Sequence, residues 1–222
     1  MTGETWEIVF FTIKTSALST LIILPFGIAI AWLLARRAWP GKAIVETAVM
    51  LPLFVPPVAT GLLLLMLFGR NGPFGATLDR AGIDVVFTWR AVVIACAVMS
   101  FPLLVRTSQS AFQDVNTRFE DIARTLGANE WRVFRTISLP LALRGIIAGA
   151  ILSFARAMGE FGATAVVAGI IPHKTMTISL SIYQHVQLGQ DADALPLLLV
   201  SIAVVFVTVL CGQIISMRKP RR

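Results

Sequence analysis

The sequence contains 222 residues, of which 56% are hydrophobic and only 14% are charged. This composition excludes a soluble domain, in which about a quarter of the residues are charged. The net charge of +7 comes mainly from Lys and Arg beside apolar runs, as in the cytoplasmic flanks of membrane proteins, so it does not indicate nucleic-acid binding.

Five apolar segments are predicted to cross the membrane as helices, because an isolated strand in lipid would leave its backbone groups unpaired. They cover residues 8–35, 43–68, 89–105, 141–171 and 194–217. The predicted fold class is therefore an all-α integral membrane protein with one domain over residues 8–217. Arg36 and Arg37 follow the first segment in place of a small-residue cleavage site, so this segment is expected to be a span and not a signal peptide.

Prolines interrupt several of these segments. Pro25 lies in the first, Pro52, Pro56 and Pro57 lie in the second, and Pro102 lies in the third. Proline removes a backbone donor and kinks a helix. Because the freed carbonyl groups are tolerated in lipid only where neighbouring groups cover them, these helices are expected to face a bundle or a pathway.

The distribution of basic residues predicts the orientation of the chain. With the N-terminus outside, 13 of the 19 basic residues fall on inner segments, and only Arg70, Arg80, Arg90 and Lys174 fall on outer loops. We therefore expect an external N-terminus and an internal C-terminus. On the outer side, residues 177–187 are expected to form a short helix at the membrane interface.

The inner loop between the third and fourth segments, residues 114–140, is predicted to be an ordered helix-turn-helix. Thr117 and Glu120 fit a capping box, in which the Thr117 hydroxyl accepts from the Glu120 amide and the carboxylate reaches back to the Thr117 amide. Gly127 can adopt the left-handed conformation that closes a helix. Asn129 can cap the second helix.

The second loop helix is expected over residues 130–138, ending before Pro140, where the fourth segment begins. The arginines of the loop would suit anionic lipid headgroups. An ordered loop that carries both signs of charge nevertheless favours a protein docking surface. The charged residues in question are Asp114, Arg118, Glu120, Asp121, Arg124, Glu130, Arg132 and Arg135.

The loop resembles the cytoplasmic motif of type-1 ABC importer permeases, which reads Glu-Ala-Ala, three residues, Gly, nine residues, Ile, one residue, Leu-Pro. This chain has Asp121-Ile122-Ala123, then Gly127, Ile137 and Leu139-Pro140 at the same spacing, with Asp and Ile in place of the first Glu and Ala. The resemblance implies coupling helices that sit in a cleft of an ATPase subunit. The implied ATPase-coupling residues are Glu120, Asp121, Ala123, Gly127, Ile137, Leu139 and Pro140.

Further stretches, at residues 24–36, 51–57, 98–106 and 154–164, resemble the molybdate permease subunits of this family. The last stretch also resembles the sulfate permeases. The resemblance implies an importer of an oxyanion, most similar to those for molybdate, with tungstate fitting the same site and sulfate or thiosulfate as the alternative. It also implies a permease homodimer in a bacterial inner membrane, two ATP-binding subunits that use the ATP, and an external oxyanion-binding protein. No cofactor or metal is implied for this chain itself.

Arg156 and Glu160 are four residues apart in the fourth segment, where they would share one helix face. Because charged groups are costly at membrane depth, the pair is expected to face the bundle interior or a water-filled path. Two interpretations remain open: a structural pair, or a pathway or gate cation at Arg156 that Glu160 orients. Ser100 is a further candidate for the pathway.

Two other classes of membrane protein compete with this interpretation. An ATP-independent channel or secondary transporter is one, although the odd number of segments and the lack of a visible repeat argue against two related halves. A membrane enzyme is the other, but no His-Glu-x-x-His, Gly-x-Ser-x-Gly or Cys/His cluster is present. The sequence also lacks a phosphate-binding Gly-x-x-x-x-Gly-Lys-Ser/Thr loop, so ATP hydrolysis is expected in a separate subunit.

Overall fold

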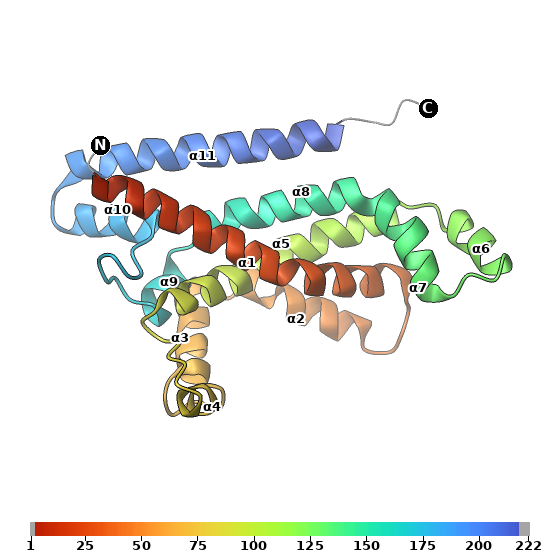
Figure 1. Cartoon of the computed structure of the whole chain (residues 1–222), viewed down its shortest axis with the longest axis horizontal. Helices are drawn as coiled ribbons and strands as arrows, with labels where there is room; N and C mark the ends of the chain where they lie inside the picture. Colours follow the sequence, from red (N-terminus) through yellow and green to blue (C-terminus); the bar gives the residue numbers. More distant parts are fainter. Residues whose placement is uncertain (1–2, 218–222) are drawn as a thin grey trace.

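The computed structural model describes residues 3–217, and the described residues form helices and no strands (Figure 1). The basic residues at 218–222, which contribute to the predicted orientation, lie outside the described residues. The helices are α1 (Gly3–Arg36), α2 (Lys42–Phe54), α3 (Pro57–Phe68), α4 (Gly75–Arg80), α5 (Trp89–Gln113), α6 (Thr117–Thr125), α7 (Glu130–Val133), the π-helical segment η1 (Phe134–Ser138), α8 (Leu139–Met158), α9 (Gly162–Val167), α10 (Ile178–Gln187) and α11 (Asp191–Met217).

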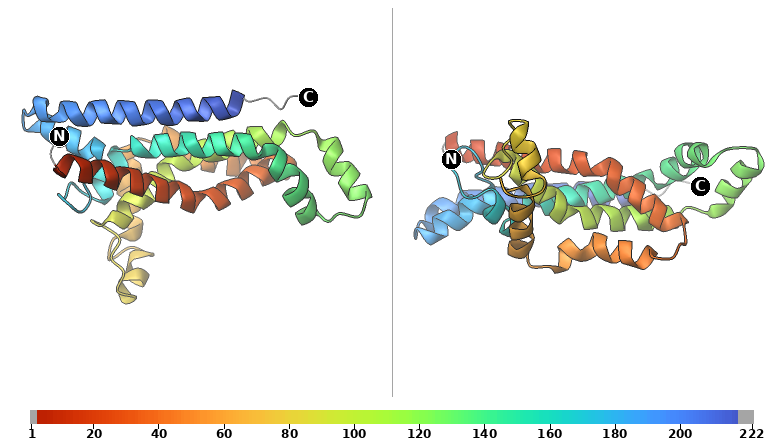
Figure 2. Two further views of the ribbon diagram at one scale, coloured as in Figure 1. Left: turned by 45° about the horizontal axis from the view of Figure 1, so that its top comes forward. Right: turned by 90° about the horizontal axis from the view of Figure 1, so that it is seen from below.

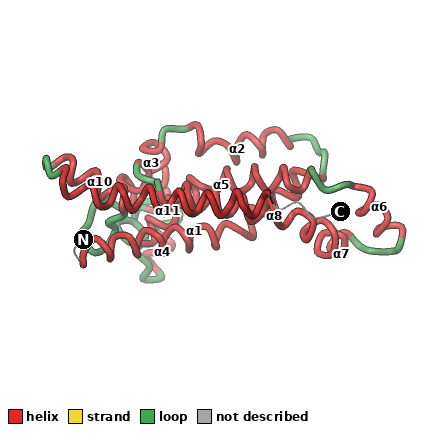
Figure 3. The backbone as a smooth tube through the Cα atoms, turned by 90° about the horizontal axis from the view of Figure 1, so that it is seen from above, coloured by secondary structure: helices red, strands yellow, loops and turns green. Residues whose placement is uncertain are grey.

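Four helices of the described chain are long and apolar enough to cross a membrane: α1, α5, the continuous helix from α7 through α8, and α11. They run side by side along the long axis of the molecule (Figures 1 and 2). The short helices α6 and α7 lie at one end of this bundle and α10 lies at the other (Figure 3). The fold therefore confirms the helical class and places the inner loop at a bundle end.

Helix α5 forms the centre of the bundle, between α1 and α8. Ala31 and Leu34 of α1 and Val105 and Phe112 of α5 are almost fully buried in one shared cluster. On the other side, a Cβ on Gly149 of α8 would lie within 3.4 Å of α5 atoms, so the two backbones approach closely. Small residues allow such close helix contacts in membranes, where apolar burial alone does not drive association.

The second predicted span, residues 43–68, is not a single helix. It divides at Pro56 into α2 and α3, which are bent by 110° relative to each other, and α3 projects away from the long helices (Figure 2). Val55 adopts an extended conformation, as a residue before proline prefers, and Pro57 stands at the first position of α3. The described chain thus has four long spans, or five if the bent pair counts as one.

The fourth predicted span, residues 141–171, is also revised. Its helix begins earlier, at Glu130, and ends at Met158; α9 is a separate short helix. Helix α9 packs on α3, where a Cβ on Gly61 would lie 2.8 Å from the Ala163 carbonyl oxygen. After Met158 the hydrogen bonds no longer follow the α-helical pattern: the Glu160 amide donates to the Ala157 carbonyl oxygen at 3.1 Å, and the Ala163 amide donates to a side chain described below.

The short helix predicted at residues 177–187 is confirmed as α10, while its place on the outer side stays a prediction. The Thr177 hydroxyl accepts from the Leu180 amide at 3.4 Å, which caps its first turn. The Ile178 amide donates to Thr12 Oγ1 of α1 at 2.9 Å. Helix α10 is therefore tied to the N-terminal half of α1.

Candidate functional site

The predicted turn of the inner loop is confirmed. Helix α6 ends at Thr125, and Gly127 follows with a φ of 85°. The Ala128 amide donates to the Ala123 carbonyl oxygen at 3.0 Å. Asn129 Oδ1 accepts from the Arg132 amide at 2.9 Å and caps α7. Glycine at a left-handed position and asparagine at an N-cap are the residue types that these positions favour, so the turn is encoded locally.

The predicted capping box is wrong. The side chain of Asn116, not Thr117, caps α6 by accepting from the Arg118 amide at 3.0 Å. The Glu120 carboxylate does not turn back to the first turn of α6. It accepts from Arg36 Nε at 2.8 Å and from Ser138 Oγ at 2.7 Å. A guanidinium and a hydroxyl in a buried site are stronger partners for a carboxylate than an exposed amide is.

The second loop helix does not end before Pro140 as predicted. It widens into the π segment η1 and continues into α8, with the Leu139 amide donating to the Phe134 carbonyl oxygen. Proline has no amide hydrogen, and its ring collides with the carbonyl group four residues earlier in a regular α-helix. A π turn accommodates this collision without ending the helix. Helix α7, the segment η1 and helix α8 are therefore one continuous helix.

One exposed side of the loop is polar. Arg124 binds Asp121 and Glu130, each through a nitrogen–oxygen contact of 2.8 Å, and all three side chains are more than a third exposed. The hydrogen bond to Glu130 raises the pKa of Arg124. We call Asp121, Arg124 and Glu130 the polar face. A fixed set of charges at the surface offers orientation to a partner more than affinity.

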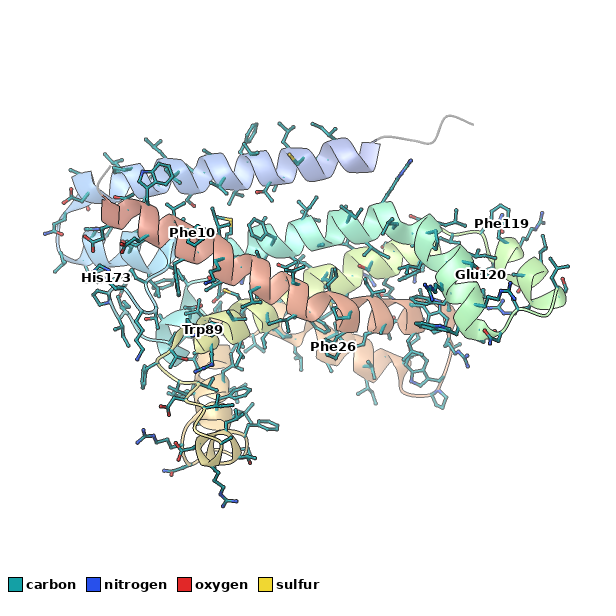
Figure 4. The ribbon with its side chains drawn as sticks, viewed as in Figure 1. Phe10, Phe26, Trp89, Phe119, Glu120 and His173 are labelled. Carbon is teal, nitrogen blue, oxygen red and sulfur yellow. The ribbon has the colours of Figure 1, made fainter. Side chains whose placement is uncertain are left out.

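The other exposed side of α6 is apolar. Phe119, Ile122 and Leu126 are 53%, 58% and 83% exposed, and Phe119 is shown in Figure 4. Beside them lies a groove of about 460 Å³, to which the motif residues Ala123, Ile137 and Pro140 contribute. The residues of this apolar face are Phe119, Ile122, Ala123, Leu126, Ile137, Pro140 and Leu141. Exposed apolar side chains that gather in this way indicate a binding surface.

The motif residue Leu139, also predicted for coupling, is half-buried at the start of α8 and packs against the cluster that α1 and α5 share. Sequence reasoning did not single out Phe119 and Leu126. Their spacing with Ile122, at three and four residues along one helix, was the available signal.

The charged pair predicted in the fourth span does form, with Arg156 Nη1 at 2.8 Å from Glu160 Oε2. Glu160, however, lies two residues beyond the end of α8, not on its face. Its second oxygen accepts from the Ala163 amide at 2.9 Å, so the carboxylate joins the end of α8 to the start of α9. The side chain of Glu160 is 1% exposed, whereas that of Arg156 is 26% exposed.

Ser100, the third pathway candidate, is fully buried between α5 and α8. Its hydroxyl donates to the Ala97 carbonyl oxygen at 3.4 Å, and its own carbonyl oxygen accepts from Ser153 Oγ at 3.2 Å. The first bond lies within α5, and the second joins α8 to α5. A role of Ser100 in a pathway stays a prediction.

The structure adds a polar contact that sequence reasoning missed. Gln109 Nε2 of α5 donates to Glu46 Oε1 of α2 at 2.8 Å. Polar residues within predicted spans were the available signal. Their pairing could not be predicted, because the two residues are 63 positions apart in the sequence. This bond links α2 to α5, and Val49 of α2 also packs against the cluster that α1 and α5 share.

Comparison with known proteins identifies the family. Residues 23–218 match the family described as binding-protein-dependent transport system inner membrane component. The chain belongs to this family. Membership confirms that it is a transport subunit and not an enzyme.

Similar proteins within this transport family include the molybdenum transport system permease protein ModB of Escherichia coli K12. It is 46% identical over 215 residues, which cover 96% of this chain and 94% of that protein. ModB of Haemophilus influenzae is 39% identical over 95% of this chain and 93% of its own length. The sulfate transport system permease protein CysT of E. coli K12 is 38% identical, but over 73% of this chain and 58% of its own length.

Solved structures of transport components share the fold. A chain of a bacterial alginate ABC transporter, crystallised with its periplasmic protein, superposes with a TM-score of 0.74 at 19% identity, over 98% of this chain and 80% of that chain. A chain of a methionine ABC transporter gives a TM-score of 0.69 at 20% identity, over 96% and 92%. The chain therefore has a fold that is also found in ABC transporters.

Proposed function

We propose that this chain is the membrane permease subunit of an ATP-driven importer for molybdate, with tungstate as a second substrate. The observation that carries the proposal is the similarity to the molybdenum permeases, which extends over almost the full length of both proteins. The sulfate permease aligns with a smaller part of each chain. Sulfate or thiosulfate is therefore the second candidate within the same family.

The inner loop would serve as the docking element for the ATPase subunit. The apolar face supplies exposed side chains that lose contact with water on binding, and the polar face supplies fixed charges that select the orientation. The continuity of the loop with α8 supports transmission, because displacement of α7 must also displace α8.

The complex would contain two copies of this chain, two ATP-binding subunits and an external oxyanion-binding protein. The exposed apolar side of α2 and α3 supports a second copy, because no residue of α2 is buried and Leu51, Phe54 and Leu63 are 51%, 79% and 56% exposed. The alginate transporter that shares the fold was crystallised with a periplasmic protein. An external N-terminus and an internal C-terminus would place the loop on the ATP side.

Arg156 would contact the oxyanion on its way through the membrane. A cation without a counter-charge would hold an anion too tightly, and conduction requires sites from which the ion can leave. The Glu160 carboxylate, 2.8 Å from Arg156, moderates this charge and orients the guanidinium.

The substrate is tested with the complex reconstituted in proteoliposomes together with its binding protein and ATPase. Molybdate and tungstate are expected to stimulate ATP hydrolysis and to accumulate in the lumen, while sulfate at the same concentration does neither. Stimulation by sulfate alone would support the second candidate. Accumulation that does not depend on ATP would refute an ATP-driven importer and favour a channel or secondary transporter.

The orientation is tested by labelling single cysteines at Thr5 and at Lys219 with a membrane-impermeant reagent in intact cells. Thr5 is expected to react and Lys219, which lies outside the described residues, to be protected. Labelling at Lys219, or protection at Thr5, would contradict the orientation.

A further inference from the structure

The buried side of α6 centres on Glu120, whose side chain is 2% exposed and touches two other parts of the chain. One oxygen accepts from Arg36 Nε at the end of α1, at 2.8 Å, and from Ser138 Oγ of η1, at 2.7 Å. Arg36 also donates through Nη2 to the Val115 carbonyl oxygen at 3.0 Å. This carboxylate therefore joins α6 to both α1 and η1 (Figure 4).

Glu120 is buried and lines neither docking face, although its Oε2 lies 3.8 Å from Nη2 of Arg124 in the polar face. Its neighbours Asp121 and Ile122 have exposures of 66% and 58%. A partner that binds the loop can contact these two residues, but it cannot reach the Glu120 carboxylate. One side of α6 is therefore open to a partner, and the other side contacts the bundle.

The contact of Glu120 with Arg36 is the main link between α6 and α1. Helix α8 follows the loop through a continuous backbone, but Arg36 is 84 residues from Glu120 in the sequence and is linked to α6 only through space. The Trp32 and Phe134 rings, 5.2 Å apart between centres, join α1 to η1 rather than to α6. Charge-assisted hydrogen bonds have a defined direction and distance, so they transmit position better than apolar contact does.

We propose that Glu120 is a positioning residue that moves the inner end of α1 together with α6 when the ATPase displaces the loop. The proposal rests on the proposed function in that an ATP-driven subunit docks on this loop. In this arrangement α8 receives the displacement through its backbone, and α1 receives it through the contact of Glu120 with Arg36.

The first test measures molybdate transported per ATP hydrolysed in proteoliposomes. For Glu120→Gln we expect a fall of at least tenfold in this ratio, with the ATPase still co-purifying and basal hydrolysis within about twofold of the parent. Asp114→Asn, an exposed carboxylate in the same loop, is the matched control and is expected to keep the parent ratio. A merely structural role would lower both rates together, and an unchanged ratio would overturn the proposal.

Loss of the co-purified ATPase in Glu120→Gln, with the permease still folded, would also overturn the proposal, because the residue would then act in docking. If Glu120→Gln does not fold, Ser138→Ala removes one of the two donors and leaves Arg36 in place. A ratio between the parent value and a tenfold loss is then expected. A parent ratio in Ser138→Ala would count against the proposal.

A second test does not depend on the substrate. Spin labels at Arg37 and Arg118, in a chain with Cys96 and Cys211 replaced by Ala, report the distance between the end of α1 and the start of α6. With ATP and vanadate, the parent is expected to keep one narrow distance distribution, and Glu120→Gln is expected to broaden it at least twofold. An equally narrow distribution in Glu120→Gln would overturn the link. If the distribution broadens but no oxyanion stimulates the parent complex, the proposed substrate fails and the link stands.

Discussion

Neutralising the two members of the buried ion pair is expected to have unequal effects on stability. Arg156→Gln leaves the Glu160 carboxylate without a counter-charge at a position that is 1% exposed. Removal of one partner of a buried pair costs about 3–5 kcal/mol of unfolding free energy. Glu160→Gln instead leaves Arg156, which is 26% exposed and partly hydrated, and a glutamine oxygen can still accept from the Ala163 amide. We expect roughly half the cost, about 2 kcal/mol, for this variant.

The double variant Arg156→Gln/Glu160→Gln is expected to recover most of the loss, because replacement of both charges leaves no uncompensated ion in the interior. Thermal unfolding of the purified chain in detergent measures these differences. At roughly 2–4 °C per kcal/mol for a chain of this size, Arg156→Gln should lower the midpoint by on the order of 10 °C.

The reasoning would be refuted if the double variant were no more stable than Arg156→Gln, or if Glu160→Gln were the less stable single variant. Transport by the double variant then separates the two roles of the pair. A stable double variant that does not transport molybdate supports a pathway role for Arg156. Normal transport would leave the pair with a structural role alone.

Three further substitutions follow from the geometry of the chain. Gly127→Val places a β-branched residue at a φ of 85°, which should destabilise the turn by about 1–2 kcal/mol. This variant is expected to stay in the membrane but to lose transport, whereas the control Gly127→Asn is expected to retain it. Normal uptake by the Val variant would contradict the role of the turn. Asp121→Lys should lower ATPase co-purification with less than about 1 kcal/mol of destabilisation, because the residue is 66% exposed; undiminished co-purification would remove this residue from the docking surface. Gly162→Ala would bring a Cβ to 2.7 Å from Pro57 Cβ and should lower the free energy of unfolding by about 1–3 kcal/mol. The control Gly3→Ala places its Cβ in open space and should leave the thermal midpoint unchanged. Equal midpoints for the two variants would refute the close packing of α3 on α9.

Several features could be predicted from the sequence because they depend on local chemistry. A segment in lipid must satisfy its own backbone hydrogen bonds, so apolar runs predict helices before any packing is known. The turn at Gly127 and Asn129 follows from the backbone preferences of these residue types. The motif from Asp121 to Pro140 indicated the family because it is a pattern of residue types within one short stretch of the chain.

Tertiary structure decided the features that depend on partners distant in the sequence. The three-residue spacing of Thr117 and Glu120 allowed a capping box. The Glu120 carboxylate instead binds Arg36, 84 residues away in the sequence, because a buried cation is a better partner than an exposed amide. Prolines marked a break in the second span, yet the 110° bend depends on the contact of α3 with α9. Glu160 matched a helical spacing with Arg156, but its bond to the Ala163 amide accompanies the end of α8. Local spacing limits which contacts a side chain can make, and the folded chain determines which partner lies within reach.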